Sequence, residues 1–370
     1  MRLLAKVSCF LVGLLYIISG FIKAVDPLGF SYKLEEYLIV GNLEFLDFST
    51  LFMAFFLCAL EIGIGISLLI RYNLKFWAPC SLILIAFFTL LTGVSAIFDV
   101  VKDCGCFGDA LKLTPEESFT KDLILLLLSS IIYRYRLYLF PVLNNQLANK
   151  LVMALAIITS LIISYWGVKH LPMIDYRAYK IGNNLIEKMS DGIADEIESI
   201  FQYKSKETGE LRKLTTSELM SIDHQKWEFV DVEHKVIKEG KNASINDFMI
   251  IDEHGQERTI DILNEDGAQI MVISYNIEGA DKDALIAISN LSNELKNVSF
   301  LGLTNGDANK NEILRHDIQA AFPFFSVDQT ALKTMIRSNP GIMLIKNGVV
   351  IGKWHHNDLP NKSKINERLN

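Results

Sequence analysis

Apolar residues gather in the first half of this chain, in five long runs. Each run is about as long as the helix of roughly 20 residues that crosses the hydrocarbon core of a bilayer. The fourth run is the least apolar, because Arg134 and Arg136 interrupt it, and we expect them to mark its exit at the membrane interface. The pattern predicts five membrane-spanning helices, at residues 7–22, 50–70, 77–98, 121–140 and 151–168.

The second half of the chain has a different pattern. Residues 169–246 are polar and mixed, with a predicted hairpin over 201–214 around Thr208-Gly209 and a strand at KWEFVDVEH. From about residue 247 strands and helices alternate, which predicts an α/β region. Its predicted strands are 248–252, 269–275 and 298–305, its helices are 280–296, 308–320 and 329–336, and its hairpin is 341–354 with Asn347-Gly348 at the turn.

Charge orients the spans. The N-terminus, the turn after the second span and the segment after the fourth carry basic residues and no acidic ones, whereas loops 23–49 and 99–122 are net negative. The positive-inside rule puts the basic segments in the cytoplasm and both acidic loops outside, together with the C-terminal region. The net charge of −7 over 370 residues leaves no basic face for nucleic acid. We expect a multi-pass protein of the bacterial inner membrane, with a cytoplasmic N-terminus and a periplasmic C-terminal region.

The second acidic loop contains Cys104-Gly105-Cys106, two of the five cysteines of the chain. The outer side of the membrane is oxidising, so a disulfide can form and last there. A bridge across one residue departs from relaxed disulfide geometry, so it would be strained and easily reduced, as exchanging disulfides are. Three other interpretations stay open: two free thiols packed at a loop–helix junction, half of a metal site, or a structural lid in which Gly105 and Gly108 form turns. We expect no metal.

Glu61 lies near the middle of the second span. A bare carboxylate there would cost on the order of 3 kcal/mol, so we expect an inward-facing residue with a partner. It is either a proton or substrate site that opens outward or a protonated glutamate that joins two helices. The candidate partners are Lys23, Ser19, Tyr16, Thr89 and Thr92.

Three segments carry a family resemblance. GLLYIISGFIKAVDPLGFSYKLEEYL (13–38) and ALEIGIGISLL (59–69) resemble the first two spans of the DoxX-like families, and DCGCFGDALKLTPEESFTKDLILL (103–126) is similar to the loop of the branch that includes the methylamine utilisation protein MauE. The resemblance implies a four-helix membrane unit, with Cys104 and Cys106 as a redox pair and a polar signature of Glu61, Lys23, Asp26, Asp103 and Asp109. MauE is associated with disulfide formation in a secreted dehydrogenase subunit, so the resemblance implies a methylamine metabolic process, although no residue of this chain points to methylamine itself. The fifth span and the large outer region depart from the family.

SNPGIMLIKNGVVIGKW (338–354) resembles the cis-proline strand and hairpin of thioredoxins, with Pro340 as the proline. Thioredoxins carry Cys-x-x-Cys after their central strand, where this chain has SYNIEGAD (274–281), and no cysteine follows Cys106. The resemblance implies a domain that cannot exchange disulfides and that keeps a client-binding surface at Pro340, Asn339 and Tyr275. The alternative is an ordinary turn proline in a domain that only binds a partner subunit. We expect His355-His356 at the surface.

The predicted architecture has four parts: a DoxX/MauE-like four-helix membrane domain (1–145), a fifth span and linker (146–172), an extracytoplasmic juxtamembrane region (173–246) and a degenerate thioredoxin-like domain (247–370). The first functional hypothesis is a membrane thiol-disulfide oxidoreductase for secreted or periplasmic client proteins, with a quinone as a candidate electron partner in the membrane lipid. The second is a non-enzymatic membrane anchor or assembly factor whose outer domain binds a partner in an envelope complex. A third is a small-solute or proton carrier that uses Glu61.

Overall fold

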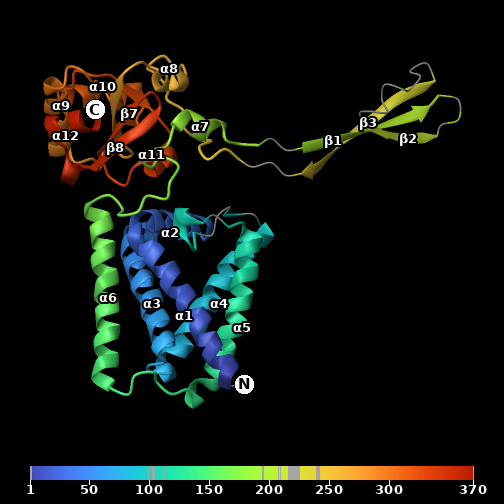
Figure 1. Cartoon of the computed structure of the whole chain (residues 1–370). Coiled ribbons are helices and arrows are strands. Elements are labelled where there is room, and N and C mark those ends of the chain that lie inside the picture. Colours follow the sequence, from blue (N-terminus) through green and yellow to red (C-terminus); the bar gives the residue numbers. More distant parts are fainter. Residues whose placement is uncertain are drawn as a thin grey trace.

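The structure, a computed structural model, describes residues 2–98, 100–101, 105–111, 113–193, 196–206, 208, 210–215, 226–238 and 242–369. It has a helical region (residues 2–169) and a C-terminal region rich in β-strands (170–369). Figure 1 shows the C-terminal region above one end of the helical region, beyond the end of α6. The two predicted halves of the chain are therefore two distinct structural parts.

Four helices in the described part of the chain are long and apolar enough to cross a membrane. They are α1 (Arg2–Val25), α3 (Thr50–Ile70), α4 (Leu74–Phe98) and α6 (Gln146–Lys169). They fit a multi-pass membrane protein, and they contain four of the five predicted spans. α1 and α3 approach closely: a Cβ at Gly65 would lie 2.7 Å from the Gly13 carbonyl oxygen, so only small residues fit at this crossing.

The predicted span 121–140 corresponds to α5 (Pro115–Tyr135), which runs beside α4 (Figure 1). The helix begins earlier than predicted because Thr114 caps it and forms a capping box with Glu117 in the first turn. Its two ends carry charged residues, and it is not among the four helices that qualify as spans by composition. The crossing predicted at residues 121–140 stays a prediction.

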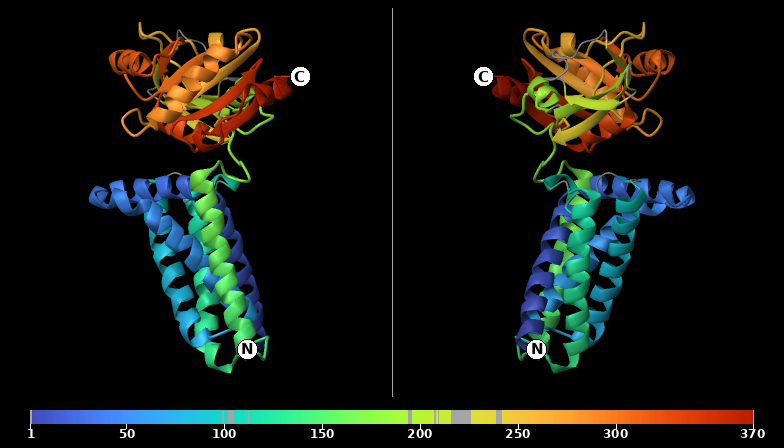
Figure 2. Two further views of the ribbon diagram at one scale, coloured as in Figure 1. Left: turned by 90° about the vertical axis from the view of Figure 1, so that its left-hand side faces the viewer. Right: turned by 90° about the vertical axis from the view of Figure 1, so that its right-hand side faces the viewer.

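The acidic loop 23–49 contains a helix that the sequence analysis missed. α2 (Pro27–Val40) begins at Asp26, whose side chain accepts a hydrogen bond from the Gly29 N–H. Figure 2 shows α2 lying across the end of the bundle that is nearest the C-terminal region. The chain continues from α2 through η1 (Glu44–Ser49) into α3. Residues 27–49 therefore lie between the bundle and the C-terminal region.

The C-terminal region is built on a five-stranded sheet of order β6-β5-β4-β7-β8. The strands are β4 (Ala268–Ser274), β5 (Ser299–Thr304), β6 (Phe324–Ser326), β7 (Gly341–Lys346) and β8 (Val349–His355). β4, β5 and β6 are parallel, whereas β7 is antiparallel to both β4 and β8. The predicted strands 269–275 and 298–305 and the predicted hairpin are confirmed. Asn347 and Gly348 have the positive φ values that its tight turn requires.

Successive side chains of each strand point to opposite faces of the sheet and pack into two separate hydrophobic cores. Met271, Ile273 and Met343 face α7 (Leu185–Ser190), α8 (Thr259–Leu263) and α11 (Gln329–Met335). Ile270, Val272 and Ile342 face α9 (Lys282–Glu294), α10 (Ala308–Asp317) and α12 (Lys362–Leu369). The three predicted helices are confirmed as α9, α10 and α11.

One predicted strand is wrong. Residues 248–252 form no strand, and only Ile251 makes isolated bridges, to Glu257 and Ser326. Phe248 and Ile250 are buried in the first core, so their apolar character reflects packing at the sheet edge.

A second, three-stranded sheet of order β2-β1-β3 projects from the C-terminal region like an arm (Figure 1). Its strands are β1 (Glu196–Ser205), β2 (Leu211–Thr215) and β3 (Trp227–Lys238). They confirm the predicted hairpin and the following strand, although Gly209 of the predicted turn lies outside the described residues. At the base of the arm, the Asp191 carboxylate accepts hydrogen bonds from the N–H and the hydroxyl of Ser244, at 2.7 and 2.6 Å.

Candidate functional site

The predicted polar residues of the membrane half meet at the end of the bundle that lies under the C-terminal region. Asp103 and Cys104 lie outside the described residues. Cys106 follows them in a turn that leads into η2 (Gly108–Ala110). Its carbonyl oxygen accepts a hydrogen bond of 2.9 Å from the Ser19 hydroxyl on α1. This bond attaches the cysteine-containing loop to the first span.

Lys23 is the partner of Glu61. The Lys23 Nζ atom lies 2.5 Å from Glu61 Oε1 and also donates to the Ser19 hydroxyl at 3.0 Å. The two charged side chains are only 3% and 1% exposed. The second carboxylate oxygen of Glu61, Oε2, is buried and has no hydrogen-bond partner among the described residues. The site therefore contains a buried ion pair with one unused acceptor.

The other candidate partners of Glu61 bond elsewhere. The Tyr16 hydroxyl donates to the Ser81 carbonyl oxygen at 3.1 Å, and the Thr89 hydroxyl donates to the Ile85 carbonyl oxygen at 2.7 Å. Thr92 donates to the Asp122 carboxylate at 3.1 Å.

Asp122, 1% exposed and 2.8 Å from Lys121, is a second buried carboxylate that the sequence analysis did not single out. Asp122 lies at the start of the predicted span 121–140, and a carboxylate in this position could have been recognised as a candidate buried charge. A small cavity of about 30 Å³ lies between the two carboxylates and is also lined by Lys23 and Cys106. It has room for about one water molecule.

Arg337, just before Pro340, joins the C-terminal region to this end of the bundle. Its guanidinium donates to the Asp26 carboxylate at 3.0 Å and to Asp109 at 3.3 Å, and the side chain is only 5% exposed. Burial on its own would raise the pKa of Asp26, but the guanidinium groups of Arg337 and Arg177 and the Gly29 N–H hold that pKa below its usual value. Two residues of the predicted polar signature thus share one buried cation.

The predicted client-binding residues lie next to the same contact. Gly341 pairs with Ile273, which places the preceding loop beside the end of β4. The Asn339–Pro340 peptide bond is cis, and the Asn339 side chain accepts from the Ser274 hydroxyl at 2.9 Å. Tyr275 packs edge-to-face against Tyr32 of α2, with ring centroids 6.4 Å apart. The ring of Tyr275 therefore contacts the chain's own helical region.

One further ion pair crosses this interface, and two more lie beside it within the C-terminal region. Lys333 on α11 lies 3.3 Å from Glu35 on α2. Close by, Lys353 on β8 and Arg177 each lie 2.7 Å from Asp175. Burial, together with the positive charge of Arg177, lowers the pKa of Lys353 to about 7. The pairs Lys333–Glu35 and Lys353–Asp175 were not predicted, because their members lie 298 and 178 residues apart in the sequence.

The prediction that His355-His356 lies at the surface is wrong for His355, which is only 2% exposed. It ends β8, pairs with Gly341 and has its ring 4.1 Å from that of His356. Burial, and then the neighbouring His356, lower its pKa to about 4, so it is neutral at physiological pH.

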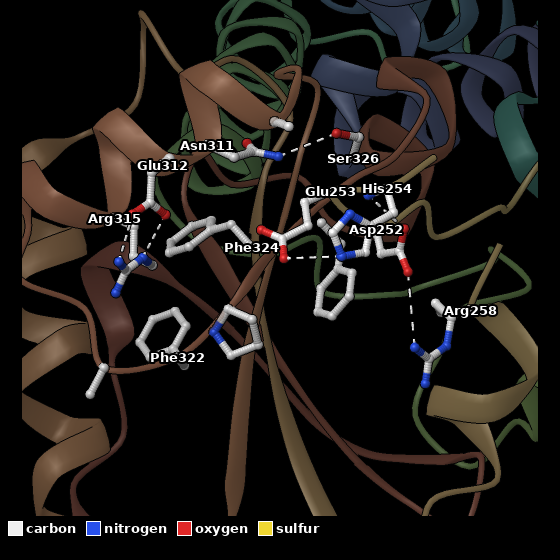
Figure 3. A pocket seen from close by; sticks show the side chains of 14 residues that line it. Asp252, Glu253, His254, Arg258, Asn311, Glu312, Arg315, Phe322, Phe324 and Ser326 are labelled. Carbon is white, nitrogen blue, oxygen red and sulfur yellow. Dashed lines mark hydrogen bonds and ion pairs between the residues drawn. The ribbon is translucent and has the colours of Figure 1, made fainter. Parts of the chain in front are cut away.

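A wider hollow of about 600 Å³ lies beside β6 and α10 (Figure 3). Its charged groups already pair with one another, Arg315 with Glu312 at 2.6 Å and Arg258 with Asp252 at 3.9 Å. Figure 1 shows α10 on the side of the C-terminal region that is turned away from the bundle. This hollow is thus remote from Cys106, and its charges are already paired, so the candidate site is the end of the bundle.

Residues 1–135 match the family model of the methylamine utilisation protein MauE. The match covers α1 to α5, which contain Ser19, Lys23, Glu61 and Asp122, and the loop with Cys106, and it ends before α6 and the C-terminal region. It supports a MauE-like membrane family for this part of the chain. No match was found among curated proteins or among solved structures.

Proposed function

We propose that this chain is a membrane thiol-disulfide oxidoreductase that acts in the maturation of exported proteins through Cys104 and Cys106. The observation that carries the proposal is the position of Cys106. Its carbonyl oxygen accepts a hydrogen bond from the Ser19 hydroxyl, which itself accepts one from Lys23 of the buried Lys23–Glu61 pair, and Lys23 and Cys106 line the same small cavity. A cation near a cysteine favours the thiolate, which is the reactive form in disulfide exchange. The similarity of residues 1–135 to MauE supports the same role.

The proposed reaction exchanges a disulfide with a client. A client thiolate attacks the Cys104–Cys106 bond and forms a mixed disulfide, and the second client thiolate then resolves it. The client leaves with a disulfide, and both cysteines of this chain are left as thiols. The strain of a Cys-Gly-Cys ring favours its opening.

For the C-terminal region we propose a degenerate thioredoxin-like domain over residues 247–370, preceded by a juxtamembrane region at 173–246. The order of the five strands and the cis bond before Pro340 support this proposal. The domain would hold the client above the cysteine loop. Because Tyr275 packs on Tyr32, a client would reach Pro340 and Asn339 from the rim of the interface with the bundle.

We place the protein in the bacterial inner membrane, with residues 1–145 as a four-helix unit, residues 146–172 as a further span and linker, and the N-terminus in the cytoplasm. The distribution of basic and acidic loops supports this orientation. It puts Cys106 and the C-terminal region on the oxidising, periplasmic side. The description of the matched family names methylamine utilisation, and maturation of an enzyme for that process is the corresponding proposal for the client.

The test is a double Cys104→Ser/Cys106→Ser variant, with Cys80→Ser as the matched control. We expect the full-length double variant to lose oxidation of a reduced dithiol peptide while it keeps the helix content of the wild type. Cys80 lies on α4 and does not line the site, so its substitution leaves the rate unchanged. Wild-type peptide oxidation by the double variant would contradict the proposal.

The arm formed by β1, β2 and β3 favours a second candidate, a non-enzymatic anchor or assembly factor. Phe229 and Val230 on β3 are about half exposed, at 51% and 49%, although they are apolar. In this role the C-terminal region would bind an envelope protein whatever the state of the cysteines. Crosslinking in cells that recovers the same stable partner with the wild type and with the double cysteine variant would favour this candidate.

A further inference from the structure

We infer that an apolar cavity between α2, α3 and α4 binds a membrane quinone, which accepts the electrons of the Cys104–Cys106 pair. The inference rests on the proposed function and adds to it the position and chemical class of the electron acceptor. The cavity has a volume of about 480 Å³, within the range of small-molecule sites. Its apolar wall includes Leu34, Leu38, Met53, Leu57, Phe87 and Leu91.

The cavity can be reached from the lipid. Phe56 on α3 and Phe87 on α4 both line it, yet they are 57% and 51% exposed. Both residues lie on helices that are apolar enough to cross a membrane, so their exposed faces contact the acyl chains. A ligand with a long apolar tail would therefore enter sideways from the bilayer.

Part of the cavity wall belongs to the candidate site. Lys23, Gly105 and Cys106 form this part of the wall. An ammonium group has three N–H donors. Within the described part of the chain Lys23 donates to Ser19 and Glu61, which leaves one donor for a ligand oxygen. The ligand therefore has a head that accepts a hydrogen bond at the end of an apolar body.

The small cavity behind Lys23 provides a place for a proton. Lys23 and Cys106 line both cavities, and Glu61, whose Oε2 has no hydrogen-bond partner among the described residues, lines the smaller one. A buried carboxylate oxygen with no donor costs free energy unless a proton or water fills it. Glu61 can therefore accept a thiol proton and return it to the ligand.

The redox step balances with a quinone as the oxidant. The S–H bonds of Cys104 and Cys106 break, one S–S bond forms, and the pair loses two electrons and two protons. The quinone takes both electrons, its two carbonyl oxygens become hydroxyls, and it leaves as the quinol. A lipid acyl chain would fill the same apolar wall but would have no oxygen for Lys23 and would accept no electrons.

The test uses the full chain in phosphatidylcholine nanodiscs with a photoreactive azidoquinone, in wild type and in the Cys104→Ser/Cys106→Ser variant. Labelled peptides are mapped by mass spectrometry. Leu91→Trp fills the cavity from α4, and Met53→Trp fills it from α3. The matched controls are Leu90→Trp and Phe52→Trp, because these neighbours are 64% and 75% exposed and do not line the cavity.

We expect labels on α3 and α4 around the cavity, in the wild type and in the double serine variant alike. Each cavity-filling variant lowers labelling at least about tenfold, equivalent to about 1.4 kcal/mol of binding free energy. It also slows reduction of a short-chain quinone by the reduced protein but leaves exchange with a dithiol peptide intact. The two controls behave as wild type.

The outcomes separate the two proposals. Labelling elsewhere, labelling unchanged in both cavity-filling variants, or labelling that excess lipid abolishes would overturn the quinone site. Labelling at the cavity without quinone reduction would leave a binding site and contradict the role of the quinone as electron acceptor. Thiol exchange without any quinone labelling would keep the proposed function and remove the quinone site.

Discussion

Lys23 and Glu61 are two opposite charges in an apolar bundle, and their environment decides what they contribute. The Lys23 ammonium also lies 5.0 Å from the centroid of the Phe30 ring and 5.2 Å from that of Phe88, so cation–π contacts with both rings stabilise its charge. A buried ion pair adds little net stability over an apolar pair, but removing one partner leaves an uncompensated buried charge. The pair therefore contributes more to the geometry of the site than to the net free energy of folding.

We predict that Lys23→Met lowers the free energy of unfolding of the bundle by about 3–5 kcal/mol, because Glu61 then stays buried and unpaired. The double variant Lys23→Met/Glu61→Leu should recover most of this loss, since it removes both charges. The measurement is denaturant unfolding of the full chain in detergent micelles, followed by far-ultraviolet circular dichroism. If the free energy of unfolding lost by the double variant equals the sum of the losses of Lys23→Met and Glu61→Leu, the two side chains are not coupled.

Among the elements, α2 connects the two regions of the chain. Asp26 at its start and Glu35 within it each bind a basic residue of the C-terminal region, and Tyr32 between them packs edge-to-face against Tyr275. Arg337 supplies the most buried of these contacts, because it binds Asp26 and Asp109 together. The cysteine-containing loop and α2 are thus held to the C-terminal region by the same guanidinium.

We predict that Arg337→Gln loosens this interface without unfolding either region. Backbone amides of 27–40 and 105–111 should exchange hydrogen at least about tenfold faster, because local opening then costs less free energy. Arg315→Gln is the matched control, since Arg315 pairs with Glu312 one turn earlier on α10 and forms no ion pair with a described residue of the bundle. The measurement is hydrogen exchange with mass spectrometry. Equal exchange in the two variants would contradict the role given to Arg337.

The sequence predicted elements whose signal is local and missed contacts between distant residues. The four apolar spans were found because their length matches a bilayer, and β4, β5 and the β7–β8 hairpin because their apolar runs and the Asn347-Gly348 turn are local patterns. α2 was missed because its apolar positions form no strong periodic stripe in an acidic loop. Arg337 gave no signal, because its carboxylate partners lie 311 and 228 residues away in the sequence. The pairing of Glu61 with Lys23 was predictable as one of five candidates, since an intramembrane charge requires a partner.

At the scale of the whole molecule, three cavities share a lining residue, Lys23. They are the small cavity at Glu61, the apolar cavity at α2 and a cleft of about 180 Å³ under Arg337. Cys106 borders the first two, and the preceding Gly105 borders the cleft. A client would approach through the cleft, an electron acceptor through the lipid and a proton through the polar cavity. The C-terminal region, standing over the cleft in Figure 1, would select the client.

The measurement that most directly tests the redox role is thiol trapping in intact cells with a membrane-impermeant maleimide. It is done on wild type and on Cys104→Ser, with and without prior reduction. We predict that the wild type is labelled only after reduction, because the Cys104–Cys106 pair is oxidised and faces outward, and that Cys104→Ser is labelled at Cys106 without reduction. Ready labelling of the wild type without reduction would mean two outward free thiols in an oxidising compartment, and it would contradict the proposed electron transfer.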